Sequence, residues 1–312
     1  MDEKKATRQA YGEALAELGK DKNIVVLSAD LTDSTKTNLF ADKFPDRFFQ
    51  CGVAEQNMVG MAAGLALSGK TPFISTFAAF VPNRTLDQIR ISVCYNNANV
   101  KFGITHAGLS VGKDGATHQA LEDIAIMRSL PNMRVVVPCD YEETKKAVKE
   151  SAKIKGPIYL RLGRSKTPMI TDKKSFFKIG KANILKKGSD VTIIACGIMV
   201  HKALTAAEEL SKQGIKAEVI NAHTIKPLDK KIIIDSAKKT SAIVTAEEHQ
   251  ANGGLGSAIS ELLAKKHPTP IEFVAVNDSF GESGMAEELL KKYHLTKKDI
   301  ILAAKKVFKR KS

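Results

Sequence analysis

Short apolar runs alternate with amphipathic helical stretches along most of the chain, and this rhythm limits the fold more than any other feature. An expected helix at 6–19 precedes the apolar run 23–28, and a similar pattern resumes from 191 onward. Asp140, with Glu143 three residues later, predicts the start of another helix. Wholly apolar runs of this length are typical of strands in a parallel sheet. We therefore expect an α/β fold with two doubly wound, mostly parallel sheets.

A polar, lysine-rich segment at 167–187 interrupts this rhythm. A chain of 312 residues is long enough to form two domains rather than one. We therefore expect a first domain at 1–166, a linker at 167–187 and a second domain at 188–312.

The net charge of +14 raises the hypothesis of a nucleic-acid partner. The basic residues are, however, spread along the chain and interleaved with acidic ones, and only Lys305–Lys311 forms a basic cluster. We interpret the charge as solvated surface, which also suits anionic substrates or an acidic partner protein. The sequence therefore predicts no nucleic-acid partner.

The first residues, MDEKKATR, lack the apolar core of a signal peptide, and no apolar run approaches the length of a membrane span. We therefore expect a cytoplasmic protein with no membrane partner. The four cysteines form no CxxC pair, which favours reduced, buried thiols over a disulfide framework or a zinc site. They are Cys51, Cys94, Cys139 and Cys196.

The stretch from Cys51 to Phe80 places an acid before a run of small residues. Glu55 precedes an expected helix rich in Gly and Ala, and a short strand then leads to Phe77 and Phe80. An acid followed by two aromatic rings suits a flat, nitrogen-rich ring better than a sugar or a metal. A structural interpretation is also open, because the helix dipole favours Glu in a first turn and small residues let a helix approach a sheet. Spacing alone does not decide between the two.

A glycine-rich loop after the expected strand 100–104 carries two histidines and an aspartate. His106 ends the strand, and Asp114 and His118 lie just before an expected helix. This set suits proton transfer or the recognition of hydroxyl groups. Turn-forming glycines with two surface histidines would give the same pattern.

Further candidates follow other expected strands, at the edge where open α/β sheets bind ligands. Asp30 and Ser34 follow the run 23–28, and Arg164 follows IYLRL, where an arginine suits a phosphate but is also common as a surface residue. The glycines at 253–256 lack the full dinucleotide-binding spacing, and we interpret them as turn and packing residues.

Five motifs occur together in order: GVAEQNMVGMAAGLA, STFAAF, GKDGATHQ, PNMRVVVPCD and VNDSFGESG. They resemble the carboxyl-terminal half of transketolase, and match best the split type in which that half is a separate polypeptide. The resemblance covers essentially the whole chain. It implies a pyrimidine-binding domain for the first half and the transketolase C-terminal domain for the second.

The resemblance also implies roles for individual residues. It makes Glu55 the acid that bonds a ring nitrogen of thiamine diphosphate, and Glu55 and His118 the catalytic residues. Phe77 and Phe80 would stack on the pyrimidine of the cofactor, and Asp30 would lie beside its thiazolium ring.

The substrate residues follow from the same resemblance. Asp114 and His118 match groups that recognise sugar hydroxyls, and Gln119 lies next to them. The positions that match the phosphate site of the donor sugar are Arg8, Ser34, His106 and Arg164.

Two positions depart from the pattern of full-length transketolases. Asn83 replaces a usual tyrosine, so we expect a less aromatic pyrimidine pocket. Ala116 replaces a proline, so we expect a more mobile loop.

The chain lacks the GDG motif followed by Asn with which this superfamily binds the metal and the diphosphate. We therefore expect the ligands of Mg²⁺ on a separate N-terminal transketolase subunit, with the cofactor bound across the interface. Self-dimerisation of this chain would then give a heterotetramer.

The implied reaction transfers a two-carbon ketol unit from xylulose 5-phosphate to ribose 5-phosphate. A deoxyxylulose-phosphate synthase-like condensation is the first alternative, although that family tends to have a second His where this chain has Gln119. A 2-oxo acid dehydrogenase beta subunit would lack the DGATHQ loop. A non-catalytic regulatory subunit that kept the fold is less favoured, because Glu55, Asp114 and His118 are all retained.

Overall fold

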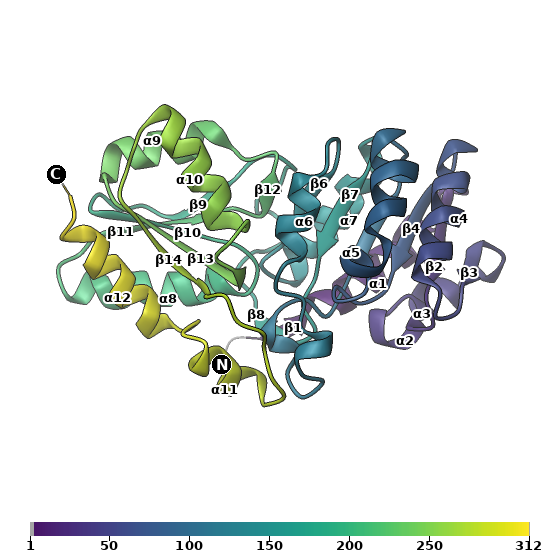
Figure 1. The fold of residues 1–312 in the computed structure, drawn as a ribbon, viewed down its shortest axis with the longest axis horizontal. Helices are drawn as coiled ribbons and strands as arrows, with labels where there is room; N and C mark the ends of the chain where they lie inside the picture. The colour runs from purple at the N-terminus through teal and green to yellow at the C-terminus, as the bar shows by residue number, and fades with distance from the viewer. Residues whose placement is uncertain (1–2, 312) are drawn as a thin grey trace.

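Two mostly parallel sheets organise residues 3–311, the part of the chain that the computed structural model describes (Figure 1). The first sheet contains, in spatial order, β12 (Thr224–Lys226), β6 (Arg134–Val136), β7 (Ile158–Arg161), β5 (Lys101–Ile104), β4 (Thr71–Ser75), β2 (Ile24–Ser28) and β3 (Phe48–Gln50). The second contains β14 (Ile271–Val276), β13 (Ile243–Gln250), β10 (Val191–Ala195), β11 (Ala217–Asn221) and β9 (Asn183–Lys186). Within these sheets only β12 and β9 run antiparallel to a neighbour, so the predicted α/β class is confirmed.

Helices cover both faces of the first sheet, which explains why its central strands β2, β5 and β7 are buried along their whole length. They are α1 (Thr7–Leu18), α4 (Glu55–Leu67), α5 (Val81–Gln88), a π-helical segment (Ile89–Tyr95), α6 (Asp123–Ser129) and α7 (Tyr141–Lys153). Ile24 and Val26 of β2 belong to a buried cluster with residues of α1 and α7. Val25 and Leu27 belong to a second cluster with residues of α4 and α5. Successive strand residues face opposite sides, so both sides must be apolar.

The second sheet is covered in the same way, and its core is continuous with the first. One face carries α8 (Met199–Lys212) and α12 (Lys297–Phe308), and the other carries α9 (Lys230–Thr240) and α10 (Leu255–Lys266). Ile233 of α9 and Ile259 of α10 share one buried cluster with Met58 of α4. The strand β12 also comes from the second half of the chain but pairs with β6 in the first sheet. The two halves are therefore joined by both packing and strand pairing.

The segment expected as a linker at 167–187 contains strands. β8 (Lys166–Pro168) pairs with β1 (Lys4–Ala6) in a two-stranded sheet, and β9 pairs with β11. Strands of three or four residues carry too little periodicity to be recognised from sequence. We propose that the second domain begins before β9, earlier than residue 188.

Short helical segments complete the description. They are α2 (Thr32–Thr35), α3 (Asn38–Ala41), α11 (Ala286–Lys292) and three 3₁₀ turns at Pro45–Arg47, Leu109–Val111 and Ala116–His118. Three of the four free cysteines are buried, as expected, whereas Cys51 is half-buried. No helix within residues 3–311 has the length and apolar character needed to cross a membrane.

Asp140 ties the start of α7 to the segment after β8. Its Oδ1 accepts hydrogen bonds from the Glu143 backbone N–H at 2.9 Å and from the Thr171 hydroxyl at 2.8 Å. Its Oδ2 accepts from the Ile170 backbone N–H at 2.7 Å. The side chain is fully buried, so these donors have no access to water in its place.

We expect Asp140→Ala to lower the free energy of unfolding by about 2–4 kcal/mol, because it leaves several buried donors unpaired. Chemical denaturation of the chain measures this loss. The control is Asp172→Ala, which removes an exposed carboxylate that accepts hydrogen bonds only within its own turn. Equal losses in the two variants would contradict the assigned role of Asp140.

Candidate active site

One edge of the first sheet collects side chains that the sequence predicts at a site. Asp30 follows β2, Phe77 follows β4, His106 follows β5 and Arg164 follows β7. Because these four strands are neighbours and parallel, their carboxyl ends lie at the same edge. Within residues 3–311, no hydrogen bond or ion pair joins Asp30 to the other predicted residues, and its backbone N–H donates to Gln50 Oε1 at 2.7 Å.

Glu55 opens α4 and is only 5% exposed. Its Oε1 accepts a hydrogen bond from Nη1 of Arg84 at 2.8 Å. The guanidinium carbon of Arg84 also lies 4.0 Å from the centre of the Phe80 ring. A guanidinium is planar and stacks on aromatic faces. Arg84 therefore contacts both the acid and one of the rings that the sequence assigns to a pyrimidine.

Arg84 was not among the residues predicted from the sequence. Its i,i+4 spacing from Phe80 is a signal that could have found it, because residues four apart on a helix are neighbours. The helix that carries it is irregular, since Thr85 has non-helical dihedral angles and a π-helical segment follows. Such segments are frequent at functional sites.

A row of rings links this acid to the glycine-rich loop. The rings of Phe77 and Phe80 are stacked with centroids 5.8 Å apart. Phe77 also stacks on His106 at 3.8 Å, and His118 meets the Phe80 ring edge-on at 5.4 Å. Four rings from three segments of the chain therefore form one continuous row.

A cationic hollow of about 320 Å³ is lined in part by Arg8 and Arg164, whose charges also act on His106 of this row. Arg8 Nη1 donates to the backbone carbonyl of Ser34 at 2.9 Å, so Ser34 contributes through its carbonyl. The Nε of Arg8 is buried and has no hydrogen-bond partner within the described residues. Burial and the charge of Arg164 lower the pKa of Arg8. A bound anion would accept a hydrogen bond from the Nε of Arg8 and would offset the repulsion between Arg8 and Arg164.

Arg164 connects the hollow to the glycine-rich loop. Its Nη1 donates to the Val111 carbonyl at 2.6 Å and lies 3.6 Å from Oδ2 of Asp114. Asp114 therefore offsets part of the positive charge at one side of the hollow.

His106 lies beside this cluster of cations. Burial, followed by the charges of Arg8, Arg164 and His118, lowers the pKa of His106 to about 3. Its Nδ1 lies 2.8 Å from the Thr105 hydroxyl. The imidazole is therefore neutral near pH 7 and can serve as a hydrogen-bond group without changing its charge.

The two departures from the family pattern lie close in sequence to rings of the aromatic row, Asn83 to Phe80 and Ala116 to His118. Asn83 Nδ2 donates to Oε1 of Glu122 and to the Ala79 carbonyl, each at 3.2 Å. Ala116 is exposed and opens a 3₁₀ turn that ends at His118. The expected effects on pocket and loop mobility stay predictions.

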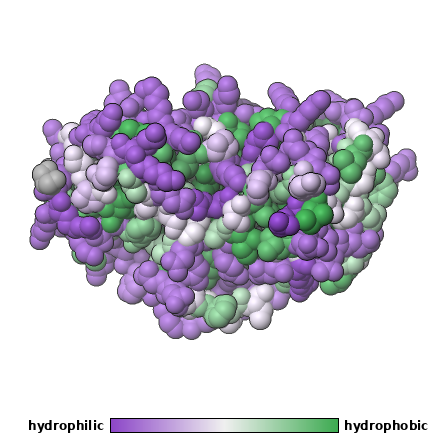
Figure 2. Space-filling view, turned by 45° about the horizontal axis from the view of Figure 1, so that its top comes forward, coloured by the Kyte–Doolittle hydropathy of each residue, from purple (hydrophilic) through white to green (hydrophobic). Residues whose placement is uncertain are grey.

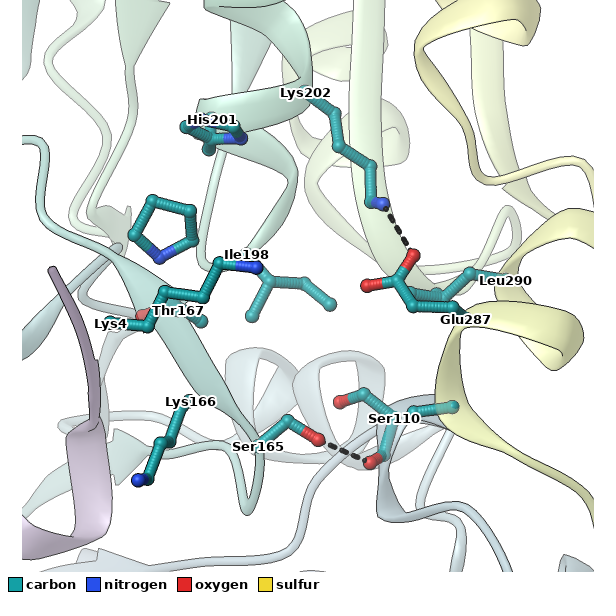
Figure 3. Close-up of a pocket in the computed structure, with 12 residues that line it drawn as sticks. Lys4, Ser110, Ser165, Lys166, Thr167, Ile198, His201, Lys202, Glu287 and Leu290 are labelled. Carbon is teal, nitrogen blue, oxygen red and sulfur yellow. Dashed lines mark hydrogen bonds and ion pairs between the residues drawn. The ribbon is translucent and has the colours of Figure 1, made fainter. Parts of the chain in front are cut away.

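A cavity of about 790 Å³ lies between the two domains, away from Glu55 (Figure 3). Ser110 and Ser165 line it from the first domain and also line the cationic hollow. From the second domain, Lys202 and Glu287 face each other across 3.3 Å. Glu55 and Phe80 belong instead to the outer face that carries α4 and α5. Among residues 3–311, no group of three or more His, Cys, Asp or Glu side chains is arranged to hold a metal ion.

Comparison with known proteins identifies the class to which this fold belongs. Residues 3–169 match the model of the transketolase pyrimidine binding domain, and residues 180–300 match that of the transketolase C-terminal domain. The chain therefore belongs to the transketolase family, which uses thiamine diphosphate. This confirms the resemblance carried by the sequence motifs.

Individual relatives agree with this assignment. The chain is 50% identical to a protein from Methanocaldococcus jannaschii named as a transketolase C-terminal section, over 93% of this chain and 92% of the relative. It is 44% identical to the 6-deoxy-6-sulfo-D-fructose transketolase subunit SqwH of Clostridium sp., over 98% of this chain and 95% of the relative. It is 41% identical to human transketolase over 98% of this chain but only 49% of that enzyme. The chain thus resembles a split-type C-terminal subunit.

A solved structure described as a split-gene transketolase, an inactive β4 tetramer, is similar to the whole chain. It has 51% sequence identity and a TM-score of 0.93, and the match covers 98% of this chain and 99% of that one. Transketolase from Leishmania mexicana matches with 25% identity and a TM-score of 0.82, over 100% of this chain and 46% of that enzyme.

We expect the imidazole of His106 to stay neutral from about pH 8 down to about pH 5, because its pKa is lowered to about 3. The unfolded state binds this proton first as the pH falls below about 6.5, so His106 reduces stability progressively between about pH 6.5 and pH 3. Imidazole NMR shifts, assigned with His106→Asn, measure the titration. A midpoint between about pH 5 and pH 8 would contradict the described surroundings.

Proposed function

We propose that this chain is the C-terminal subunit of a two-subunit transketolase that transfers a two-carbon ketol unit from xylulose 5-phosphate to ribose 5-phosphate. The observation that carries the proposal is the meeting of a nearly buried acid, a row of aromatic rings and a cationic hollow at one sheet edge. The first two suit the ring of thiamine diphosphate, and the hollow suits a sugar phosphate. When bound, the cofactor supplies the reactive carbon and the electron sink.

The residues of this chain fit the pyrimidine of thiamine diphosphate. Glu55 is nearly buried and would donate or share a proton at a ring nitrogen of the pyrimidine. Phe77 and Phe80 are already stacked beside it and would contact the ring through their faces. Asp30, at the end of β2, would lie towards the thiazolium.

The same edge provides for the substrate. We assign Arg8, Arg164 and His106 to the phosphate, because the buried donor of Arg8 lacks an acceptor and His106 is neutral. Asp114 and His118 would bind the sugar hydroxyls, and His118 would hold or move a proton there. Ser34 supports this set by holding Arg8 through its carbonyl.

The surface around Glu55 supports the need for a partner. Large hydrophobic side chains are exposed on α4, on the loop before it, on α5 and on the π-helical segment: Val53, Met61, Leu67, Leu86, Ile91 and Tyr95. Figure 2 shows hydrophobic residues at the surface of both halves of the molecule, including the half that the first domain forms. Contiguous exposed apolar surface marks interaction sites. We propose that an N-terminal transketolase subunit, bearing the Mg²⁺ ligands, covers this face in a heterotetramer.

A second substrate class deserves the same assay, because one relative is a sulfosugar transketolase subunit and another, from Phocaeicola vulgatus, is an apulose-4-phosphate transketolase subunit. A sulfonate and a phosphate both present several oxygens to arginine donors. The cationic hollow is therefore compatible with either group. Parallel assays with xylulose 5-phosphate, 6-deoxy-6-sulfo-D-fructose and apulose 4-phosphate as donors distinguish them.

The deciding experiment mixes this chain with its N-terminal partner and measures donor consumption with thiamine diphosphate and Mg²⁺. We expect turnover only from the mixture, and a loss of about 100-fold or more in Glu55→Gln. The matched control is Glu142→Gln, which changes another glutamate in the first turn of a helix, far along the chain in α7. Turnover by this chain alone would refute the partner requirement. Unchanged turnover in Glu55→Gln would favour a non-catalytic role or another acid.

Arg84 competes with a ring that uses both Glu55 and Phe80, because it contacts both. We expect Arg84→Ala to lower the dissociation constant of thiamine diphosphate in the mixed complex by about three- to tenfold, which corresponds to roughly 1 kcal/mol. Calorimetric titration measures the constant. The control is Arg90→Ala, which changes an exposed arginine of the adjacent π-helical segment. Weaker binding in Arg84→Ala would show that Arg84 supports Glu55 instead of competing for it.

A further inference from the structure

The second domain holds the loop that carries Asp114 and His118, here named the sugar loop and defined as residues 108–119. Gln119 Nε2 donates to the backbone carbonyl of Glu282 at 2.9 Å. The Ser283 hydroxyl donates to the Lys113 carbonyl at 2.6 Å. Both partners lie between β14 and α11, so the middle and the end of the sugar loop rest on the second domain.

The start of the sugar loop is held by a buried carboxylate. Glu248 lies in β13 and is only 5% exposed. Its Oε1 accepts a hydrogen bond from the Ser110 backbone N–H, and its Oε2 accepts from the Ser110 hydroxyl at 3.2 Å. A Cβ on Gly108 would lie 2.3 Å from the carboxyl carbon of Glu248, and Gly108 has φ +83°. Only glycine allows both the backbone turn and this close approach.

The backbone of β13 anchors the residues that follow the sugar loop. Arg161 Nη2 donates to the carbonyls of Glu248 and Ala120, at 3.0 and 3.2 Å. The Gln250 backbone N–H donates to the Leu121 carbonyl at 2.7 Å. In these contacts β13 contributes only main-chain atoms, so the side chain of Glu248 is the part of β13 whose contact with the loop a substitution at this strand can remove.

Ser110 also lines both the cavity between the domains and the cationic hollow. Its carbonyl accepts a hydrogen bond from the Ser165 hydroxyl at 2.9 Å, next to Arg164. Figure 3 shows this pair at the wall of the cavity between the domains. Ser110 and Ser165 both line the cationic hollow. A shift of Ser110 would therefore also displace Ser165 and change the shape of the hollow.

We propose that Glu248 is a positioning residue for the sugar substrate: by fixing both donors of Ser110, it keeps the sugar loop where Asp114 and His118 can bind the substrate. The inference rests on the proposed function for the role of these two residues. It adds that a residue of the second domain, outside the cofactor site, sets affinity for the sugar.

The burial of Glu248 is consistent with this role, because a carboxylate without access to water is stabilised only by the hydrogen bonds it accepts within the protein. Desolvation raises the pKa of Glu248 to about 7, opposed by Arg161, by Ser110 and by Lys202. A buried carboxylate that loses its hydrogen bonds is costly, so the loop and Glu248 hold each other in place.

Glu247→Gln is a matched control for Glu248→Gln. Glu247 is the adjacent residue, is also buried, and has a pKa that burial likewise raises to about 7. Its carboxylate, however, accepts from the backbone N–H groups of Leu255 and Gly256 at the start of α10. It thus supports the second domain without a hydrogen bond to the sugar loop, and it lies too close to Gly254 for a Cβ at that position.

The experiment uses the complex with the N-terminal subunit and two measurements. Hydrogen exchange reports the protection of amides in residues 108–119, and steady-state kinetics report KM for the ketose donor and kcat. We expect Glu248→Gln to speed exchange in this loop and to raise KM about tenfold, equivalent to roughly 1.4 kcal/mol, with a smaller change in kcat. Glu247→Gln should lower thermal stability without either effect. Ser110→Ala, which keeps the backbone N–H, should change both readouts in the same direction but less.

The outcomes separate this inference from the proposed function. Faster exchange with an unchanged donor KM would overturn the positioning role, as would equal changes in both glutamate variants. If the wild-type complex consumes no donor, the proposed function fails. Unchanged hydrogen exchange of residues 108–119 in Glu248→Gln would then still overturn the inference that Glu248 holds the sugar loop. Should Glu248→Gln fail to fold, unchanged exchange and KM in Ser110→Ala would overturn it.

Discussion

A buried ion pair between Arg161 and Asp123 joins the parts on which the candidate site depends. Arg161 Nε donates to both carboxylate oxygens of Asp123, at 2.8 and 3.1 Å, and the Tyr159 hydroxyl donates to the same carboxylate. The carboxylate raises the pKa of Arg161 despite its burial. The guanidinium also bonds carbonyls before α6 and in β13. A buried pair is favourable only when its donors are satisfied in this way, so the geometry of both domains is fixed at this point.

The acidic and the basic side chains of the candidate site lie at opposite ends of the row of aromatic rings. Glu55, paired with Arg84, stands at one end, and Arg8 and Arg164 stand at the other, with the rings of Phe77 and Phe80 between them. This order suits a ligand set with a nitrogen-rich ring at one side and an anion at the other. The acid end belongs to an outer face with exposed apolar side chains, whereas the cationic end is lined by both domains. The proposed partner would therefore complete the cofactor end, and the second domain of this chain would complete the proposed sugar end.

Periodicity predicted the regular elements well because burial on both faces leaves a strong pattern. The runs around β2 and β10 and the helix α7, with Asp140 at its N-cap, all formed where the sequence indicates. The short strands β1, β3, β9 and β12 were not predicted, because pairing with a neighbour defines them and their own residues do not. The placement of β12 in the first sheet is the clearest case, since its sequence lies in the second half of the chain.

The sequence by itself determined the fold class, the family and the residue types at the strand ends, since each depends on local pattern and order of motifs. Only the tertiary structure decided which of those residues are in contact and which groups are left without a partner. It paired Glu55 with Arg84, left the Nε of Arg8 without an acceptor and placed Glu248 against Ser110, 138 positions earlier in the chain. The first two depend on how segments of the first domain pack and the third on how the two domains pack, and no periodicity within any one segment records them.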